Sequence, residues 1–421
     1  MPALTRAGLA LAACLAVSAS AAAAEAARTI ALTTASPEAR AAAVEVVRRI
    51  ENMQFGPDLQ AAARKAVEAD PQFAFGHYLV GVTGPGAQSK PHFDKATELA
   101  RGASAGERRY IEAALLNRAQ KAAEALVIFE ALAREYPDER MVQMMLGQIN
   151  LAQGKAAAAR AAFQRAMALD AGTARVHALM ANLEGLAGNY AAARELYRAA
   201  LARRASGTVP GQVFFGLTMT YLYEGEVDAA LGAMQAFLAE YQKSPQAAQQ
   251  PEVFIWNAMA RINLENGRYD AALAAYRKGY ESVPGSGLDE RQKAIWLGRL
   301  HHGIGRTLAR MGKADEAWKE AEAVKKMIDE GGEDGKEFVP AWHYLAGYMK
   351  LEAGDAKAAV EHLKQADQDD PFIQLLLARA YEKAGDTLSA RKSYQAVVES
   401  TQFGLDRALA YNEARKKLSS L

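Results

Sequence analysis

The stretch LGQINLAQGKAAAARAAFQRAMALD (residues 146–170) decides the fold, because a second copy of its pattern aligns with it without a gap. The second copy is MANLEGLAGNYAAARELYRAALARR (180–204). Gly154 and Gly188 lie 34 residues apart, and the aromatic residue nine positions after each glycine keeps the same spacing. A period of this length is typical of a repeated helix-turn-helix unit.

The pattern recurs along the rest of the chain. Further turn glycines of the same kind are Gly225, Gly267, Gly312, Gly354 and Gly385. From Gly154 onward the intervals are 34, 37, 42, 45, 42 and 31 residues. The longer intervals predict longer connecting loops, at RRASGTVPGQ, QKSPQAAQQPE, PGSGLDERQ and DEGGEDGKE.

The residue types explain why such a unit pairs two helices and then stacks on its neighbours. Glycine ends the first helix and lets the chain turn back. Small residues let two helices approach closely, and the recurring aromatic residue fills the space between pairs. One pair cannot bury its apolar face alone, so adjacent copies must stack. An all-α class is therefore expected.

The repeats resemble the tetratricopeptide repeat. The best single match is WNAMARINLENGRYDAALAAYRKGYESVP, which has in register Trp256, Gly267, Tyr269, Ala272, Tyr276 and Pro284. The resemblance implies an α-solenoid, a right-handed superhelix of stacked antiparallel helix pairs. It divides the chain into three helical segments: degenerate hairpins at 37–137, an array of about seven repeats at 140–400, and a capping helix at 404–421. The pairing of DPQFAFGHY with a later GERRYIEA is similar to exported bacterial tetratricopeptide-repeat proteins of unsettled role.

The N-terminus predicts export. Residues 1–24 have one basic residue, Arg6, an apolar run, and small residues that end before Glu25, which is the layout of a cleaved signal peptide. This favours the periplasm. An alternative uses Cys14, because Leu11 to Cys14 fits the site at which bacterial lipoproteins are cut and acylated, and would anchor the chain in the outer membrane.

Composition and motifs argue against several classes of function. Removal of Arg6 with the signal leaves as many basic as acidic residues, so no bulk charge favours nucleic acid or an anionic membrane. GVTGPGAQSK (81–90) fails as a phosphate loop, because Ala87 and Gln88 stand where Lys and Ser or Thr are required. The histidines lack metal-ligand spacing, and no nucleophile motif is present. We expect no enzyme, nucleotide, cofactor or metal.

A surface stripe remains as the candidate site. In tetratricopeptide arrays the first helices line a concave groove, and positions 2, 5, 9 and 12 face the ligand. Those positions are rich in arginine and asparagine, with aromatic side chains between them. The resemblance assigns ligand binding to Arg175, Asn182, Phe215, Asn257, Arg261, Arg299, His302, Arg306, Tyr344, Tyr348 and Arg379.

The leading hypothesis is a non-catalytic scaffold of the bacterial cell envelope that binds a protein or peptide through this concave face. The alternative hypothesis is an outer-membrane lipoprotein that forms a structural part of an envelope assembly or secretion machine. Partner identity and oligomeric state do not follow from the sequence, because repeat arrays change partners by surface substitution without a change of fold.

Overall fold

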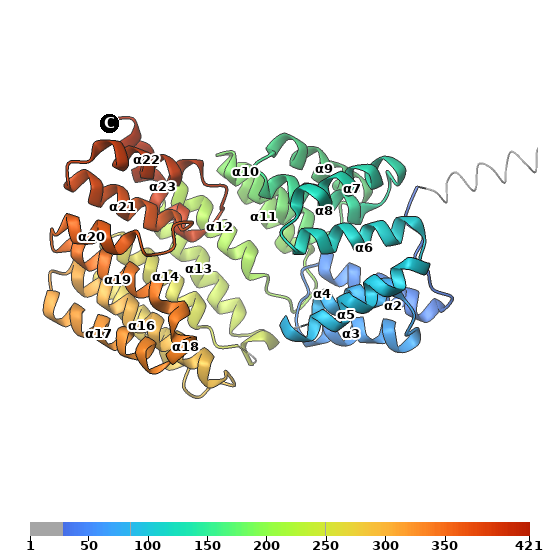
Figure 1. Ribbon diagram of the computed structural model, residues 1–421, viewed down its shortest axis with the longest axis horizontal. Coiled ribbons are helices and arrows are strands. Elements are labelled where there is room, and N and C mark those ends of the chain that lie inside the picture. Colours follow the sequence, from blue (N-terminus) through green and yellow to red (C-terminus); the bar gives the residue numbers. More distant parts are fainter. Residues whose placement is uncertain (1–27, 85, 249) are drawn as a thin grey trace, which may run out of the picture. The chain divides into compact units, whose positions relative to one another are not determined.

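The computed structural model describes residues 28–84, 86–248 and 250–421, and throughout these residues the regular structure is helical (Figure 1). The predicted signal peptide and Cys14 lie outside the described residues. None of the helices in the described ranges is both long enough and apolar enough to cross a membrane. The all-α class is confirmed.

The chain forms two compact units, which we describe separately. Unit 1 contains the described residues up to Leu183, together with Arg198–Ser206. Its helices are α2 (Pro37–Glu51), α3 (Pro57–Ala69), α4 (Ala74–Thr83), α5 (Gly86–Leu99), η1 (Ala100–Gly102), α6 (Ala105–Arg118), α7 (Ala122–Glu135), α8 (Arg140–Ala152) and α9 (Ala156–Leu169). Two further helices divide between the units, α10 (Ala174–Leu186) and α11 (Tyr190–Arg203).

Unit 2 contains Glu184–Tyr197 and Gly207–Leu421. Its helices are α12 (Gly211–Tyr223), α13 (Val227–Tyr241), η2 (Pro245–Ala248), α14 (Val253–Glu265), α15 (Tyr269–Glu281), α16 (Glu290–Arg310), α17 (Ala314–Glu330), α18 (Gly332–Gly335), η3 (Lys336–Phe338), α19 (Val339–Glu352), α20 (Ala356–Leu363), α21 (Pro371–Lys383), α22 (Thr387–Glu399) and α23 (Leu405–Leu418).

Consecutive helices pack as pairs, and from α8 onward the turn inside each pair follows the predicted chemistry. Gly154 and Gly267 follow the first helix of their pairs with φ of 71° and 76°. This left-handed conformation is strained for residues with a Cβ atom. In the α6–α7 pair Gln120 takes the same conformation, with φ of 62°. That replacement explains why the N-terminal repeats match the pattern poorly.

Alanines and aromatic rings form the core between helices, as the repeat predicts. Ala159 and Ala166 are fully buried, and so are the aromatic residues Phe163 and Tyr197. A Cβ atom on Gly147 would lie 2.2 Å from the Phe163 ring. This glycine therefore lets α8 touch the aromatic ring of α9 directly, which is the close approach that the small residues of the first helix allow.

One pair departs from the repeat, and here one sequence expectation is wrong. PGSGLDERQ is a loop as far as Asp289, as predicted, but α16 begins at Glu290 and runs for 21 residues. DEGGEDGKE, also predicted to be a loop, instead forms the end of the 17-residue α17, then α18 and most of η3. Asp289 caps α16 by accepting from the Gln292 amide, and the Gln292 side chain bonds back to the Asp289 amide. This reciprocal cap starts the helix about two turns before the regular repeat position near Gly298.

The last helix of unit 2 packs back on the first part of the same unit. α23 contacts its neighbours α21 and α22, and it also contacts α12 and α14 (Figure 1). Arg407 donates to the Tyr223 hydroxyl at 3.0 Å, and the Asn412 amide donates to the Leu222 carbonyl at 3.1 Å. The final helix therefore does more than cover the end of a stack, because it joins late and early helices of unit 2.

Candidate functional site

A cavity of about 690 Å³ lies inside unit 2. Its wall is made by α14, α16, α17, the segment of α18 and η3, and the first turns of α19. Of the predicted site residues, it brings together Asn257, Arg261, Arg299, His302, Arg306 and Tyr344. Its volume is in the range of small-ligand sites in proteins.

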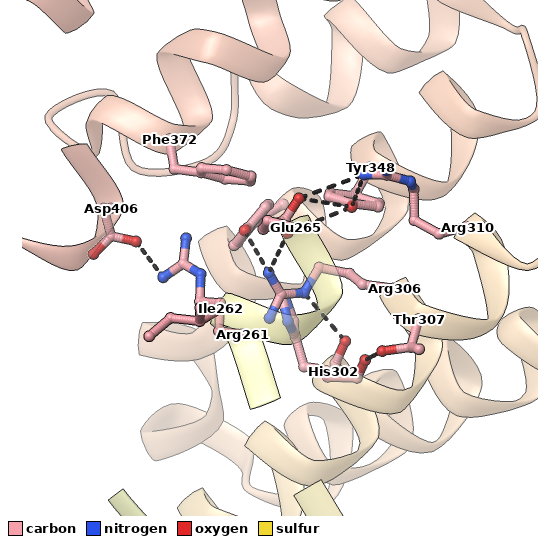
Figure 2. Close-up of polar contacts among 12 residues, drawn as sticks. Arg261, Ile262, Glu265, His302, Arg306, Thr307, Arg310, Tyr348, Phe372 and Asp406 are labelled. Carbon is pink, nitrogen blue, oxygen red and sulfur yellow. Dashed lines mark hydrogen bonds and ion pairs between the residues drawn. The ribbon is translucent and has the colours of Figure 1, made fainter. Parts of the chain in front are cut away.

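Arg306 is the best-anchored side chain of this cavity, with 5% of its surface exposed. Its guanidinium donates to the Tyr344 hydroxyl at 2.8 Å and to the Tyr276 hydroxyl at 3.3 Å. Its Nε donates to the His302 carbonyl at 3.4 Å. These partners belong to α19, α15 and α16, and Figure 2 shows the contact with the His302 carbonyl. Arg306 is thus held in place before any ligand binds.

Glu265 supplies the negative charge behind Arg306. Its carboxylate lies 3.7 Å from Arg306 and 3.5 Å from Arg310, and it accepts from the Tyr348 hydroxyl at 3.3 Å (Figure 2). Its side chain is 5% exposed. One buried carboxylate therefore serves two arginines of α16, and this network fixes the floor of the site.

Arg261 is neutralised from the C-terminal helix. It forms an ion pair with Asp406 of α23, and its guanidinium lies 4.9 Å from the centre of the Phe372 ring (Figure 2). Its Nε and Nη2 are buried without a hydrogen-bond partner within the described ranges. Such groups are costly to leave unsatisfied, so Arg261 retains capacity to donate.

Arg299 differs from the other arginines of the cavity. It is exposed, and its guanidinium lies 4.6 Å from the centre of the Trp296 ring. No carboxylate of the described chain pairs with it. Desolvation lowers the pKa of Arg299 from its ordinary value, although the side chain stays charged at neutral pH.

His302 adds a neutral polar group. Desolvation, followed by the charge of Arg306, lowers the pKa of His302 well below its usual value. Its Nε2 lies 3.2 Å from the Ala341 carbonyl, so that nitrogen carries the proton. The described residues contain no group of three or more metal-ligating side chains. The cavity can therefore hold an anion by hydrogen bonds from arginines.

Comparisons with known proteins agree with this architecture. Residues 116–183, 215–287 and 373–400 each match a family model described as tetratricopeptide repeat. The chain is a tetratricopeptide-repeat protein. No curated protein sequence matches it significantly.

Solved structures similar to this tetratricopeptide-repeat protein share the fold alone. PilW, a type IV pilus biogenesis factor, is 17% identical, with 55% of this chain and 98% of PilW covered and a TM-score of 0.41. A tetratricopeptide repeat protein from Parabacteroides merdae is 16% identical, with 68% and 98% covered and a TM-score of 0.46. The apo form of RapI is 13% identical, with 75% and 99% covered and a TM-score of 0.46.

Five predicted residues of this tetratricopeptide-repeat protein lie away from the cavity. Tyr348 is fully buried beneath it, and Arg379 donates two hydrogen bonds to Glu413 of α23. Phe215 packs in an aromatic group with Phe237, at a ring distance of 5.8 Å. In unit 1, Arg175 donates to the Gln148 side chain at 2.9 Å, and Asn182 is half-buried in the same helix.

Several residues that shape the site were not predicted. Glu265 and Asp406, which hold its arginines, lie outside the four stripe positions of the repeat. The apolar wall is also absent from the prediction: Ile295, Val324, Met327, Ile328 and Phe338. The available signal was the interval of 45 residues between Gly267 and Gly312, which exceeds the tetratricopeptide period by more than two helical turns.

Proposed function

We propose that this protein is a non-catalytic scaffold of the bacterial cell envelope that binds a protein or peptide partner at the cavity of unit 2. One observation carries the proposal. Residues chosen only by their position in the repeat, on α14, α16 and α19, line a single cavity. Solenoids commonly bind through the face made by their first helices, which supports a partner at this place.

The cavity lining suits recognition more than chemistry. Arg306 and Arg261 are engaged by fixed partners, which favours a static surface. His302 is neutral and bonded to a backbone carbonyl, so it is poorly suited to exchange protons near neutral pH. A non-catalytic role fits these properties.

The proposal is tested by photocrosslinking in the native envelope. Ala294 is exposed and lines the cavity, so a photoreactive residue at 294 should capture a partner. The matched control position is Leu388, which is 81% exposed and lies on α22. We expect an adduct from position 294, none from 388, and loss of the adduct with Arg299→Glu. Equal adducts from both positions would exclude the cavity as the binding site.

The envelope location has its own test. Mass spectrometry of the mature protein should find an unmodified chain that begins near Glu25. A diacylated N-terminal Cys14 would instead favour the lipoprotein alternative.

A further inference from the structure

The cavity exists because the α16–α17 pair is longer than its neighbours. Helices α14 and α15 have 13 residues each, whereas α16 has 21 and α17 has 17. The added turn region of α16 contributes Arg291, Ala294 and Ile295 to the lining. The C-terminal half of α17 contributes Val324, Met327 and Ile328, and η3 contributes Phe338. A hairpin of ordinary length would not supply this wall.

The cavity contains arginine donors that the described residues leave unused. Four arginines line it, together with one acid, Asp334. Arg291 is paired with Glu337, Arg261 with Asp406, and Arg306 with the Glu265 network. With Asp334 counted against Arg299, the lining and these partners carry no net charge. The donors open to an anion are the buried Nε and Nη2 of Arg261 and the guanidinium of Arg299, which no ion pair engages among the described residues.

Two further donors line the same cavity. The Asn257 side chain makes no hydrogen bond within the described part of the chain. The Tyr344 hydroxyl accepts from Arg306, and burial raises the pKa of Tyr344 to about 12, so its own proton remains available. Arg299, Asn257 and Tyr344 thus all contribute donors to the cavity. Planar guanidinium groups suit a carboxylate, which they can bind through two parallel hydrogen bonds.

Much of the rest of the lining is apolar. Val324 is buried, while Ile295, Met327 and Ile328 are half-buried around the cavity. Removal of apolar surface from water stabilises a complex, so an apolar ligand that covers these side chains is favoured. A ligand that satisfies both the arginine donors and the apolar lining needs a charged end and an apolar body.

We propose that the cavity binds a carboxylate carried on an apolar chain. The inference goes beyond the proposed function, because it assigns a small ligand to the cavity. The occupant is a free medium-chain fatty acid, and a polypeptide C-terminus, which also carries a carboxylate, is an alternative outcome of the test.

Isothermal titration of the full mature chain with defined probes tests the inference. The probes are octanoate, its cationic counterpart octylamine, and an acetylated tetrapeptide that ends in leucine as a free acid or as an amide. Octanoate should bind, and octylamine and both peptides should not. Failure of octanoate to bind, equal binding of octylamine, or tighter binding of the free-acid peptide than of octanoate overturns the proposal.

Two pairs of variants make the test specific to the cavity. Arg299→Gln should weaken binding at least about tenfold, since a hydrogen bond to a charged group contributes that much. Its control is Arg277→Gln, an exposed arginine of α15 outside the lining, which should bind as the wild type does. Unchanged affinity of Arg299→Gln would contradict the inference.

The second pair fills the cavity without a change of charge. A Cβ atom on Gly298 meets only the Met327 methyl, at 3.9 Å, so Gly298→Leu should extend into the cavity and abolish binding while the fold is retained. Gly298→Ala should bind nearly as well as the wild type. Gly232→Leu, in an open position of α13, is the control for the gain in helix propensity. Binding by Gly298→Leu at wild-type affinity would also overturn the proposal.

The two proposals fail in different ways. If octanoate binds but position 294 captures no partner, the small-ligand inference stands and the scaffold function falls. If position 294 captures a partner whose adduct depends on Arg299 but no carboxylate binds, the scaffold function stands and this inference falls.

Discussion

The α8–α9 pair of unit 1 and the α16–α17 pair of unit 2 are built on one plan, and they differ in length. α8 and α9 have 13 and 14 residues, and Gly147 lies directly against Phe163. α16 and α17 have 21 and 17 residues, and Gly298 meets only the end of Met327. Helices of matched length close on each other, whereas added turns extend past the neighbouring pair and leave space.

The two regions also differ in how their arginines are paired. Arg140 at the start of α8 is held by Glu51 and, at 2.6 Å, by Asp170. Arg306 and Arg310 of α16 both lie beside the carboxylate of Glu265, Arg310 is also 3.8 Å from Glu352, and Arg299 has no acid within the described ranges. In the regular pair, neighbouring acids neutralise Arg140. The extended pair leaves one arginine without an acid, and this difference supports the proposal that the partner binds there.

The largest expected effect comes from removal of Glu265. Glu265→Ala leaves the buried Arg306 without a counter-charge, whereas Arg310 keeps Glu352 at 3.8 Å, and this should lower the free energy of unfolding by about 4 kcal/mol. Urea unfolding followed by far-ultraviolet circular dichroism measures it. In unit 1, Glu51→Ala should cost less, because Arg140 keeps Asp170 and is itself 28% exposed. An equal or larger cost for Glu51→Ala would contradict the comparison.

Replacement of Gly147 or Gly298 by leucine should change the free energy of unfolding in opposite directions. Gly147→Leu places its Cβ atom 2.2 Å from the buried Phe163 ring, and overpacking of this kind should cost about 3 kcal/mol. Gly298→Leu relieves the low helix propensity of glycine and should gain about 1 kcal/mol. Both are read from urea unfolding of the full chain. Destabilisation by Gly298→Leu would show that α16 and α17 close as tightly as α8 and α9.

Asp406→Asn tests the comparison further, because it removes the acid that pairs with Arg261 and so leaves a second cavity arginine without an ion pair. Loss of the ion pair with Arg261 should cost about 2 kcal/mol, because it leaves buried donors of a charged group without a partner. Faster hydrogen exchange along α23 would report it. The same variant should bind octanoate more tightly, because Arg261 no longer has its fixed partner. Slower exchange or weaker octanoate binding would show that Asp406 does not restrain Arg261.

The smallest expected effect is a loss of folding stability at acidic pH, which we expect in both units. His77 and His92 of unit 1 lie with their Nδ1 atoms 3.1 Å apart, and His343 and His362 of unit 2 with theirs 3.0 Å apart. Desolvation lowers the pKa of His92, His343 and His362 from the ordinary 6.5. The unfolded chain then binds more protons than the folded chain as pH falls below 6.5, so stability is full above that pH and decreases below it.

Thermal unfolding between pH 7.5 and 5 measures this dependence. For the pair of unit 2, Lys350 reinforces the lowered pKa of His362 and Glu361 opposes it. Replacement of both His343 and His362 by glutamine should flatten the profile. An unchanged slope would show that this pair does not contribute.

The sequence predicted much of the fold because the repeat fixes short-range chemistry. Gly154 ends a helix in a conformation that glycine adopts readily, and Phe163 and Tyr197 are buried at the predicted aromatic position. Asp370 comes directly before Pro371, and it is the N-cap of α21. Each of these properties depends on residues within one or two turns.

The candidate site was predictable only in part. Repeat positions 2, 5, 9 and 12 predict the helix face on which Arg261, Arg299 and Tyr344 lie. The same positions also select Tyr348, which is fully buried. They do not find Asp406, which reaches Arg261 from the last helix of the chain. The interval of 45 residues between Gly267 and Gly312 indicated extra residues. The glycines and acidic residues near them predicted loops, whereas the structure places part of these residues in longer helices.

The sequence by itself therefore determined the helices, their turns and the small-residue faces on which they pair, because these follow from neighbours in the chain. Only the tertiary structure decided which arginines meet an acid and where the extended pair leaves a cavity. The physical reason is that both depend on distances between helices remote in sequence. A repeat pattern constrains how each helix packs on the next and leaves charge pairing across the stack open.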